Sequence, residues 1–125
     1  MTALCPCLSG LPYDGCCARL HRGDAHAATA EQLMRSRFSA FAVGDADYLV
    51  TTWHPSTRPP VLELNAELRW YRLDILRTTA GGPLDREGTV EFEAFYRSPE
   101  GAGSQRENSS FVREDRHWYY LRTLD

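Results

Sequence analysis

Between residues 30 and 43 the hydrophobic positions recur with the period of an α-helix. At about 100° per residue they form one broad apolar stripe, and no helix-breaking residue interrupts the segment. Thr29, with Gln32 three residues later, makes a capping box, and Gly44 supplies a stop signal. The pattern therefore predicts a helix over 30–43. Arg37 lies inside the apolar stripe, where a charged residue breaks the pattern.

After this helix the chain changes to a strand-like pattern. Asp45 can cap a shorter helix from residue 46 to about 52, which ends because the residue before Pro55 avoids helical geometry. Further on, residues typical of strands dominate several segments, and turn residues separate them at 80–83 and 99–103. We expect strands over 68–79, 89–98, 105–114 and 117–124, with a tight hairpin at Asp115 and Arg116. Helices followed by an antiparallel meander predict an α+β fold.

Residues 4–28 show no sustained periodicity and are rich in cysteine, proline, glycine and aspartate. We expect turns here, without a helix or strand, so something other than a hydrophobic core must order the segment. Its four thiols are spaced Cys-x-Cys, eight residues, then Cys-Cys: Cys5, Cys7, Cys16 and Cys17. Four thiolates can hold Zn²⁺ at about 2.3 Å in a closed tetrahedron, which is typical of structural sites. We therefore predict one structural zinc ion bound by these cysteines.

Two other uses of the cysteines stay open at this point. Disulfides are one alternative, but one pairing would join the adjacent Cys16 and Cys17, and a reducing cytosol disfavours every pairing. A redox pair is the other, although Cys5-Pro-Cys7 lacks the Cys-x-x-Cys spacing and the strand-then-helix setting of thioredoxin-like sites. His21, four residues after Cys17, could replace one cysteine as a ligand.

Length and composition describe a soluble globular protein. Its 125 residues suffice for one domain, so we predict a zinc knuckle and linker over 1–28 and one α+β domain over 29–125. The net charge of -3 gives no overall basic field for nucleic acid or an anionic membrane. All 14 basic residues are arginine, which excludes Schiff-base and lysine general-base chemistry. The sequence shows neither a signal peptide nor an apolar run of about 18 residues, so we expect a cytoplasmic protein without membrane contact.

Several stretches resemble known bacterial proteins. The segment Cys5-Pro-Cys-Leu-Ser-Gly-Leu-Pro-Tyr-Asp-Gly-Cys-Cys is similar to the SEC-C zinc motif, which ends the SecA translocation ATPase. Nearly the whole chain resembles the YchJ-type family, through Thr29-Ala-Glu-Gln-Leu-Met-Arg-Ser-Arg-Phe-Ser-Ala-Phe, Thr52-Trp-His-Pro-Ser-Thr-Arg, Trp70-Tyr-Arg-Leu-Asp-Ile-Leu, Val90-Glu-Phe and residues 107–120. It departs from the family pattern at Arg106-Glu107, where a His-Glu pair is common, and at the Asp115-Arg116 turn.

This resemblance implies a SEC-C zinc motif followed by a nuclear-transport-factor-like domain, similar to ketosteroid isomerase. Such a domain is a cone in which a curved, four-stranded antiparallel sheet wraps around helices. The implied order of elements agrees with the helix-then-meander pattern. The family is largely uncharacterised, so the resemblance implies an architecture and leaves the activity open.

A cone of this type would place a ligand pocket between the sheet and the helices. Arg37 is the main candidate, because a buried guanidinium needs hydrogen-bonding partners, and we expect a strand carboxylate from Asp74, Glu91, Glu93 or Glu107. It forms a structural ion pair in one interpretation and recognises an anion in the other. The remaining pocket candidates are Trp53, His54, Trp70, Glu107 and Trp118. In the structural interpretation the tryptophans are core residues and His54 interacts with a helix C-terminus.

From these features we expect a non-catalytic, zinc-binding accessory protein that presents a surface to a protein partner. A closed metal site and the absence of a recognisable catalytic motif favour this hypothesis. The alternative is a small-molecule binding protein or isomerase-like enzyme that uses the cone cavity, with Arg37 and His54 in polar roles. RNA association through an arginine face is a weaker third hypothesis, because the net charge is acidic.

Overall fold

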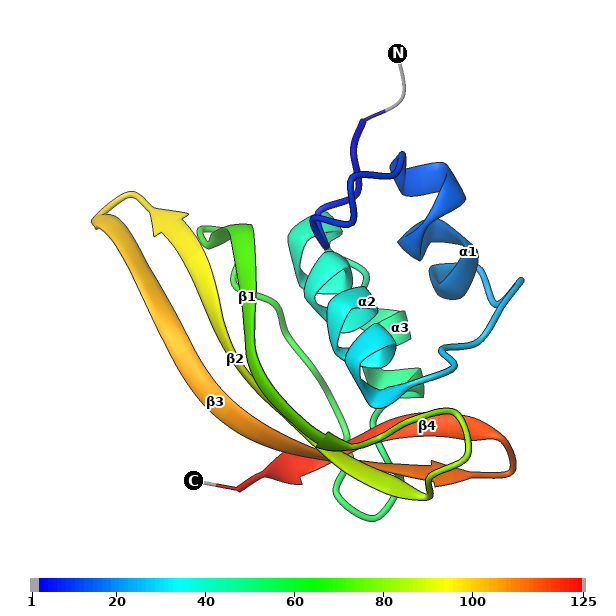
Figure 1. The fold of residues 1–125 in the computed structure, drawn as a ribbon. Helices are drawn as coiled ribbons and strands as arrows, with labels where there is room; N and C mark the ends of the chain where they lie inside the picture. Colours follow the sequence, from blue (N-terminus) through cyan, green and yellow to red (C-terminus); the bar gives the residue numbers. More distant parts are fainter. Residues whose placement is uncertain (1–2, 125) are drawn as a thin grey trace.

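The computed structural model describes residues 3–124 of the chain (Figure 1). Helical segments come first: η1 (Tyr13–Gly15), α1 (Cys17–His21), α2 (Ala30–Val43) and α3 (Ala46–Thr51). The strands follow: β1 (Arg69–Ala80), β2 (Glu87–Ser98), β3 (Gly101–Glu114) and β4 (His117–Thr123). The strands form one antiparallel sheet in the order β1-β2-β3-β4. The predicted α+β fold, with helices followed by a curved antiparallel meander, is confirmed.

The sheet curves around α2, which lies between its concave face and α1 (Figure 1). The hydroxyl of Thr29 accepts a hydrogen bond from the backbone N–H of Gln32 at 3.0 Å, and Gly44 ends α2 with a left-handed φ of 81°. Both predicted ends of this helix are confirmed. Asp45 likewise caps α3 by accepting from the backbone N–H of Tyr48 at 3.1 Å.

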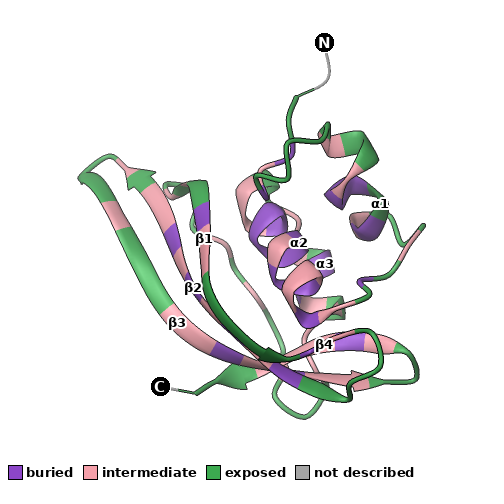
Figure 2. Ribbon diagram, viewed as in Figure 1, coloured by how far each residue is buried: buried purple, intermediate pink, exposed green. Residues whose placement is uncertain are grey.

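The main hydrophobic core lies between α2 and the concave face of the sheet, where buried residues from both gather (Figure 2). Val90, Phe92 and Ala94 alternate along β2 and are buried, as the period of a strand requires. The other buried members of this core are Ala27, Ala30, Leu33, Met34, Phe38, Leu73, Phe111 and Trp118. The sheet therefore contributes one face to the core and exposes the other.

β3 begins earlier than the sequence predicts. It starts at Gly101 because residues 101–103 pair with residues 96–98 of β2, and the turn is confined to Pro99 and Glu100. A Cβ atom at Gly103 would lie 2.6 Å from the hydroxyl of Tyr96, so glycine permits this close approach. The hairpin at 115–116 is confirmed, since both residues have the positive φ, 50° and 69°, of a two-residue hairpin turn.

The N-terminal segment contains helical turns that the sequence pattern did not predict. The expectation of turns alone over 4–28 is wrong, because η1 and the five-residue α1 lie within it. Leu20, on α1, packs with Ala40, Tyr48 and Leu49 in a second apolar cluster. The division of the chain at residue 28 stays a prediction, and the structure packs the two parts against each other. Among residues 3–124, no helix is long and apolar enough to cross a membrane.

Candidate metal centre

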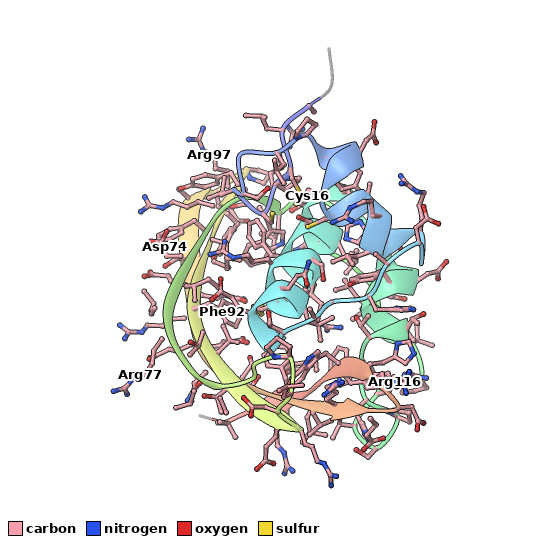
Figure 3. All side chains as sticks on the ribbon, turned by 45° about the vertical axis from the view of Figure 1, so that its right-hand side comes forward. Cys16, Asp74, Arg77, Phe92, Arg97 and Arg116 are labelled. Atoms are coloured by element: carbon pink, nitrogen blue, oxygen red, sulfur yellow. The ribbon has the colours of Figure 1, made fainter. Side chains whose placement is uncertain are left out.

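The sulfur atoms of Cys5, Cys7, Cys16 and Cys17 all lie within 4.8 Å of one another. Two short elements bring them together. A tight turn holds the first pair, with the backbone N–H of Leu8 bonded to the carbonyl of Cys5 at 3.1 Å. The second pair follows η1, since the N–H of Cys16 is bonded to the carbonyl of Tyr13 at 3.0 Å, and Cys17 begins α1. Figure 3 shows Cys16 where the N-terminal loop meets α2.

The dimensions of this cluster fit a tetrahedral thiolate site. A metal–sulfur distance of about 2.3 Å corresponds to sulfur–sulfur edges of about 3.8 Å. The sulfur atoms of Cys7 and Cys16 are 3.6 Å apart, which is close to that edge. All four cysteines are free of disulfides; Cys16 is half-buried and the others are buried. The cluster can therefore hold a metal ion in a largely buried site.

Two serine hydroxyls lie beside the cluster. The Ser9 Oγ atom is 3.2 Å from the sulfur of Cys16, and the buried Ser39 Oγ atom is 3.5 Å from the sulfur of Cys5. Hydroxyl groups at these distances can donate hydrogen bonds to thiolates, which stabilises the charged form that a metal requires. Ser39 comes from the middle of α2, so the cone domain supplies part of the environment of the centre.

Hydrogen bonds within the cluster shift the pKa values of its thiols in opposite directions. The hydrogen bond between Cys7 and Cys17 lowers the pKa of Cys7 below its usual range and raises the pKa of Cys17, which burial raises further. Burial also raises the pKa of Cys16. A metal must therefore displace protons from this cluster, and its binding should depend on pH.

Polar contacts fix the cysteine segment on α2. His21 Nε2 lies 2.9 Å from the carbonyl oxygen of Ser36 and therefore donates to it, while Nδ1 lies 2.6 Å from the hydroxyl of Tyr13. Arg35 Nη1 donates to the carbonyl of Cys7 at 3.1 Å. Both ring nitrogens of His21 thus have partners, and His21 is not a member of the ligand cluster found among the described residues. It holds the segment in place instead of replacing a cysteine.

Arg37 is buried, with 4% of its surface exposed, but its partners differ from the expected carboxylate. Its Nη1 donates to the carbonyl of Leu49 at 2.8 Å and to the hydroxyl of Thr52 at 2.7 Å. Its guanidinium carbon lies 4.8 Å from the ring centroid of Tyr120 and 5.4 Å from that of Trp53. No ion pair within residues 3–124 includes Arg37. The partial negative charge at the end of α3 and the two rings take the place of a carboxylate.

His54 connects the loop after α3 to the last two strands. Its Nε2 atom lies 2.9 Å from a carboxylate oxygen of Glu114, and its Nδ1 atom lies 2.7 Å from the hydroxyl of Ser56. Its backbone N–H donates to the carbonyl of Tyr120 at 2.8 Å. These contacts attach the loop to the sheet.

The other predicted pocket residues lie in different parts of the domain. Trp70 is half-buried beside Phe38, and Trp118 is buried, with its indole N–H donating to the carbonyl of Ala28 at 3.2 Å. Glu107 is half-buried and pairs with Phe92 across the sheet. The structure thus brings Arg37 and Trp53 together, whereas the remaining candidates do not gather into one pocket with them. Whether any of the six binds a ligand stays a prediction.

The convex face of the sheet carries charges of both signs. Arg72 is paired with Asp74 at 3.0 Å, and Arg106 with Glu91 at 3.2 Å. Asp74, Arg77 and Arg97 point outward from the sheet (Figure 3). The arginines of this face are therefore interleaved with carboxylates, which weakens the field that would attract nucleic acid.

The sequence pattern missed the residues around the cysteines. Ser39 and Arg35 contact the cluster from α2, and Ser9 contacts it from the loop. The one available signal was the position of Ser36 and Ser39 in the middle of an otherwise favourable helix, where serine is a poor choice unless its hydroxyl has a partner. Ser36 donates to the carbonyl of Leu33 at 2.8 Å.

Comparisons with known proteins find the same two parts. Residues 29–123 match the family model described as the YchJ middle NTF2-like domain, and residues 1–19 match the SEC-C motif. A UPF0225 protein of Corynebacterium efficiens is 53% identical over 116 residues, covering 93% of this chain and 88% of the relative. A UPF0225 protein of Streptomyces coelicolor is 50% identical over 119 residues, covering 95% and 93%.

Solved structures agree in fold. The solution structure of a SEC-C motif containing protein from Rhodopseudomonas palustris is similar with a TM-score of 0.81 at 33% identity, covering 98% of this chain and 97% of that one. The crystal structure of a SEC-C motif containing protein from Psychrobacter arcticus gives a TM-score of 0.76 at 31% identity, covering 94% and 79%.

Proposed function

The chain belongs to the UPF0225 family, with a SEC-C motif ahead of a YchJ middle NTF2-like domain, and from this premise we propose a metal-stabilised interaction module. Cys5, Cys7, Cys16 and Cys17 hold one structural zinc ion. The zinc-bound segment and the cone domain together present a surface to a protein partner in the cytoplasm. The module is non-catalytic.

One observation carries this proposal: the four thiols form a closed cluster that is fixed to α2. Four sulfur ligands complete a tetrahedron and leave no position for a substrate or a reactive water. The hydrogen bonds of His21 to Ser36 and of Arg35 to Cys7 hold the cluster against the cone domain. Such a centre orders a segment that has almost no core of its own, and the ordered segment adds a defined surface to the domain.

Metal analysis tests the first part of the proposal. Purified protein should contain about one zinc ion per chain, measured by native mass spectrometry and by elemental analysis. The variant Cys16→Ser should retain less zinc than Ser9→Ala, which removes only a neighbouring hydroxyl. A tetrahedral sulfur site can also hold iron, so iron at comparable content would contradict the assignment of zinc.

Affinity capture tests the second part. The wild-type protein should recover a partner from a bacterial lysate, and recovery should fall when Cys16 and Cys17 are both changed to serine. Glu100→Gln, at the turn between β2 and β3, is a matched control that leaves the metal segment intact. The recovered protein must then bind in purified form. Equal recovery by wild type and the double variant would show that the metal segment is not part of the interaction surface.

A further inference from the structure

A cavity of about 500 Å³ lies where the metal-binding segment meets the cone domain. Its lining residues come mainly from the end of α1, the linker that follows it, α3 and the start of β4. Its volume falls within the range of small-molecule sites. The described residues that line it do not include the four cysteines or Arg37, and of the predicted pocket residues only Trp118 is among them.

Carboxylates give one side of this cavity a negative charge. Asp45 and Asp47 both line it from the N-terminal end of α3. Asp45 uses one oxygen to cap α3, and its second oxygen is not engaged in that bond. The exposed carboxylate of Asp47 has no hydrogen bond or ion pair within the described part of the chain. Arg22 also lines the cavity, but its guanidinium is paired with Asp24 at 3.0 Å.

Planar side chains also line the cavity. Tyr119 and His117 line the cavity from β4, whereas the neighbouring Trp118 is buried, with 3% of its surface exposed. The rings of His26 and His117 meet edge to face, with their centroids 4.2 Å apart. Carboxylates beside aromatic faces are complementary to a cation that carries a planar group, because the ring quadrupole and the anionic oxygens both attract positive charge.

We propose that this cavity binds a small organic amine that carries an aromatic group. Its ammonium group is placed at Asp45 and Asp47, and its planar group lies against Tyr119 and the pair His26 and His117. This inference does not rest on the proposed zinc ion or on a protein partner.

Three indole compounds that differ in charge test the proposal. Tryptamine is a cation, tryptophol is neutral and indole-3-propionate is an anion, while the ring is shared. Each is titrated into the purified, metal-containing protein and followed by ¹H–¹⁵N NMR. Tryptamine should bind at least about tenfold more tightly than tryptophol, because only the ammonium gains charge-assisted hydrogen bonds. The shifts should map to the amides of His26, Asp47, His117 and Tyr119.

Two variants with the same net charge provide the control. Asp47→Asn should remove the preference for tryptamine, whereas Glu100→Gln, remote from the cavity, should retain it. Circular dichroism and zinc content of the same samples report whether the fold and the metal centre are intact. Absence of tryptamine binding, equal binding of the three compounds, tighter binding of indole-3-propionate, or an unchanged preference in Asp47→Asn would each overturn the inference. Loss of zinc with the preference retained would count against the proposed zinc site alone.

Discussion

The guanidinium of Arg37 lies at the C-terminal end of α3, inside the apolar part of the domain. Burial lowers its pKa to about 10, so it remains a cation at neutral pH. Two hydrogen bonds to the end of α3 and the faces of Tyr120 and Trp53 offset part of the cost of removing this charge from water. Through these contacts Arg37 connects α2, α3 and β4 at one point.

Removing the Arg37 side chain should therefore destabilise the fold. We expect Arg37→Ala to lower the free energy of unfolding by about 2–4 kcal/mol, because it leaves a cavity and unpaired acceptors. Arg37→Met, which keeps much of the volume, should cost less. Urea denaturation measures both, and Arg77→Ala, on the convex face, is the control. A cost for Arg37→Ala no larger than that for Arg77→Ala would show that the buried contacts contribute nothing net.

At the scale of elements, Gly81 and Gly88 bring the end of β1 against the start of β2. A Cβ atom at Gly88 would lie 2.5 Å from the Cα of Gly81, and that neighbour is backbone. The carbonyl of Gly81 also accepts from the N–H of Ala30 at 2.9 Å, so the hairpin is attached to the first turn of α2.

Gly88→Ala should destabilise the domain by about 2–4 kcal/mol, because backbone cannot move aside without breaking the ladder. Gly82→Ala is the matched control, since its nearest contact is the flexible carboxylate of Asp85 at 3.3 Å. Thermal unfolding of the two variants measures the difference. Equal melting temperatures would mean that the hairpin relaxes around the added methyl group.

Elements with strong local signals were predictable from the sequence. The capping residues Thr29 and Asp45 and the stop at Gly44 are local, so both helices after residue 28 were found. α1 was missed because five residues are too few to show a helical period, and its stability comes from packing of Leu20 and from the cysteine segment. The start of β3 was misplaced because pairing with β2 overrides the turn preference of its glycines.

The sequence predicted which residues form the candidate metal centre, but it did not predict which residues surround them. Cysteine spacing alone indicated which thiols meet, and the structure brings them together. The position of Ser39 beside Cys5 depends on how the segment packs on α2, which no spacing encodes. The partners of Arg37 were missed for a similar reason. The end of α3 reaches it only through tertiary packing, so a strand carboxylate was the wrong choice.

In the molecule as a whole, the main core and the cysteine cluster are separate, and the apolar cluster around Leu20 lies between α1, α2 and α3. The main core joins α2 to the sheet, whereas the cysteines cluster around their own sulfur atoms. Leu20 and the bonds of His21 and Arg35 connect these two regions. The metal segment is therefore docked on a domain whose core is complete without it.

This division predicts how the protein responds to loss of metal. A strong chelator should raise amide hydrogen exchange in residues 4–22, while β2 and β3 keep their protection, because their core contains no cysteine. Acidification should act in the same direction. Protons compete with the metal for thiolates, so occupancy falls as the pH falls.

Exchange followed by mass spectrometry, with zinc added back as the control, measures this response. Cys16→Ser should reproduce the pattern without a chelator. Unchanged exchange over 4–22 would mean that Leu20 and His21 are sufficient to hold the segment. Simultaneous loss of protection in the sheet would show instead that metal segment and cone domain unfold as one cooperative unit.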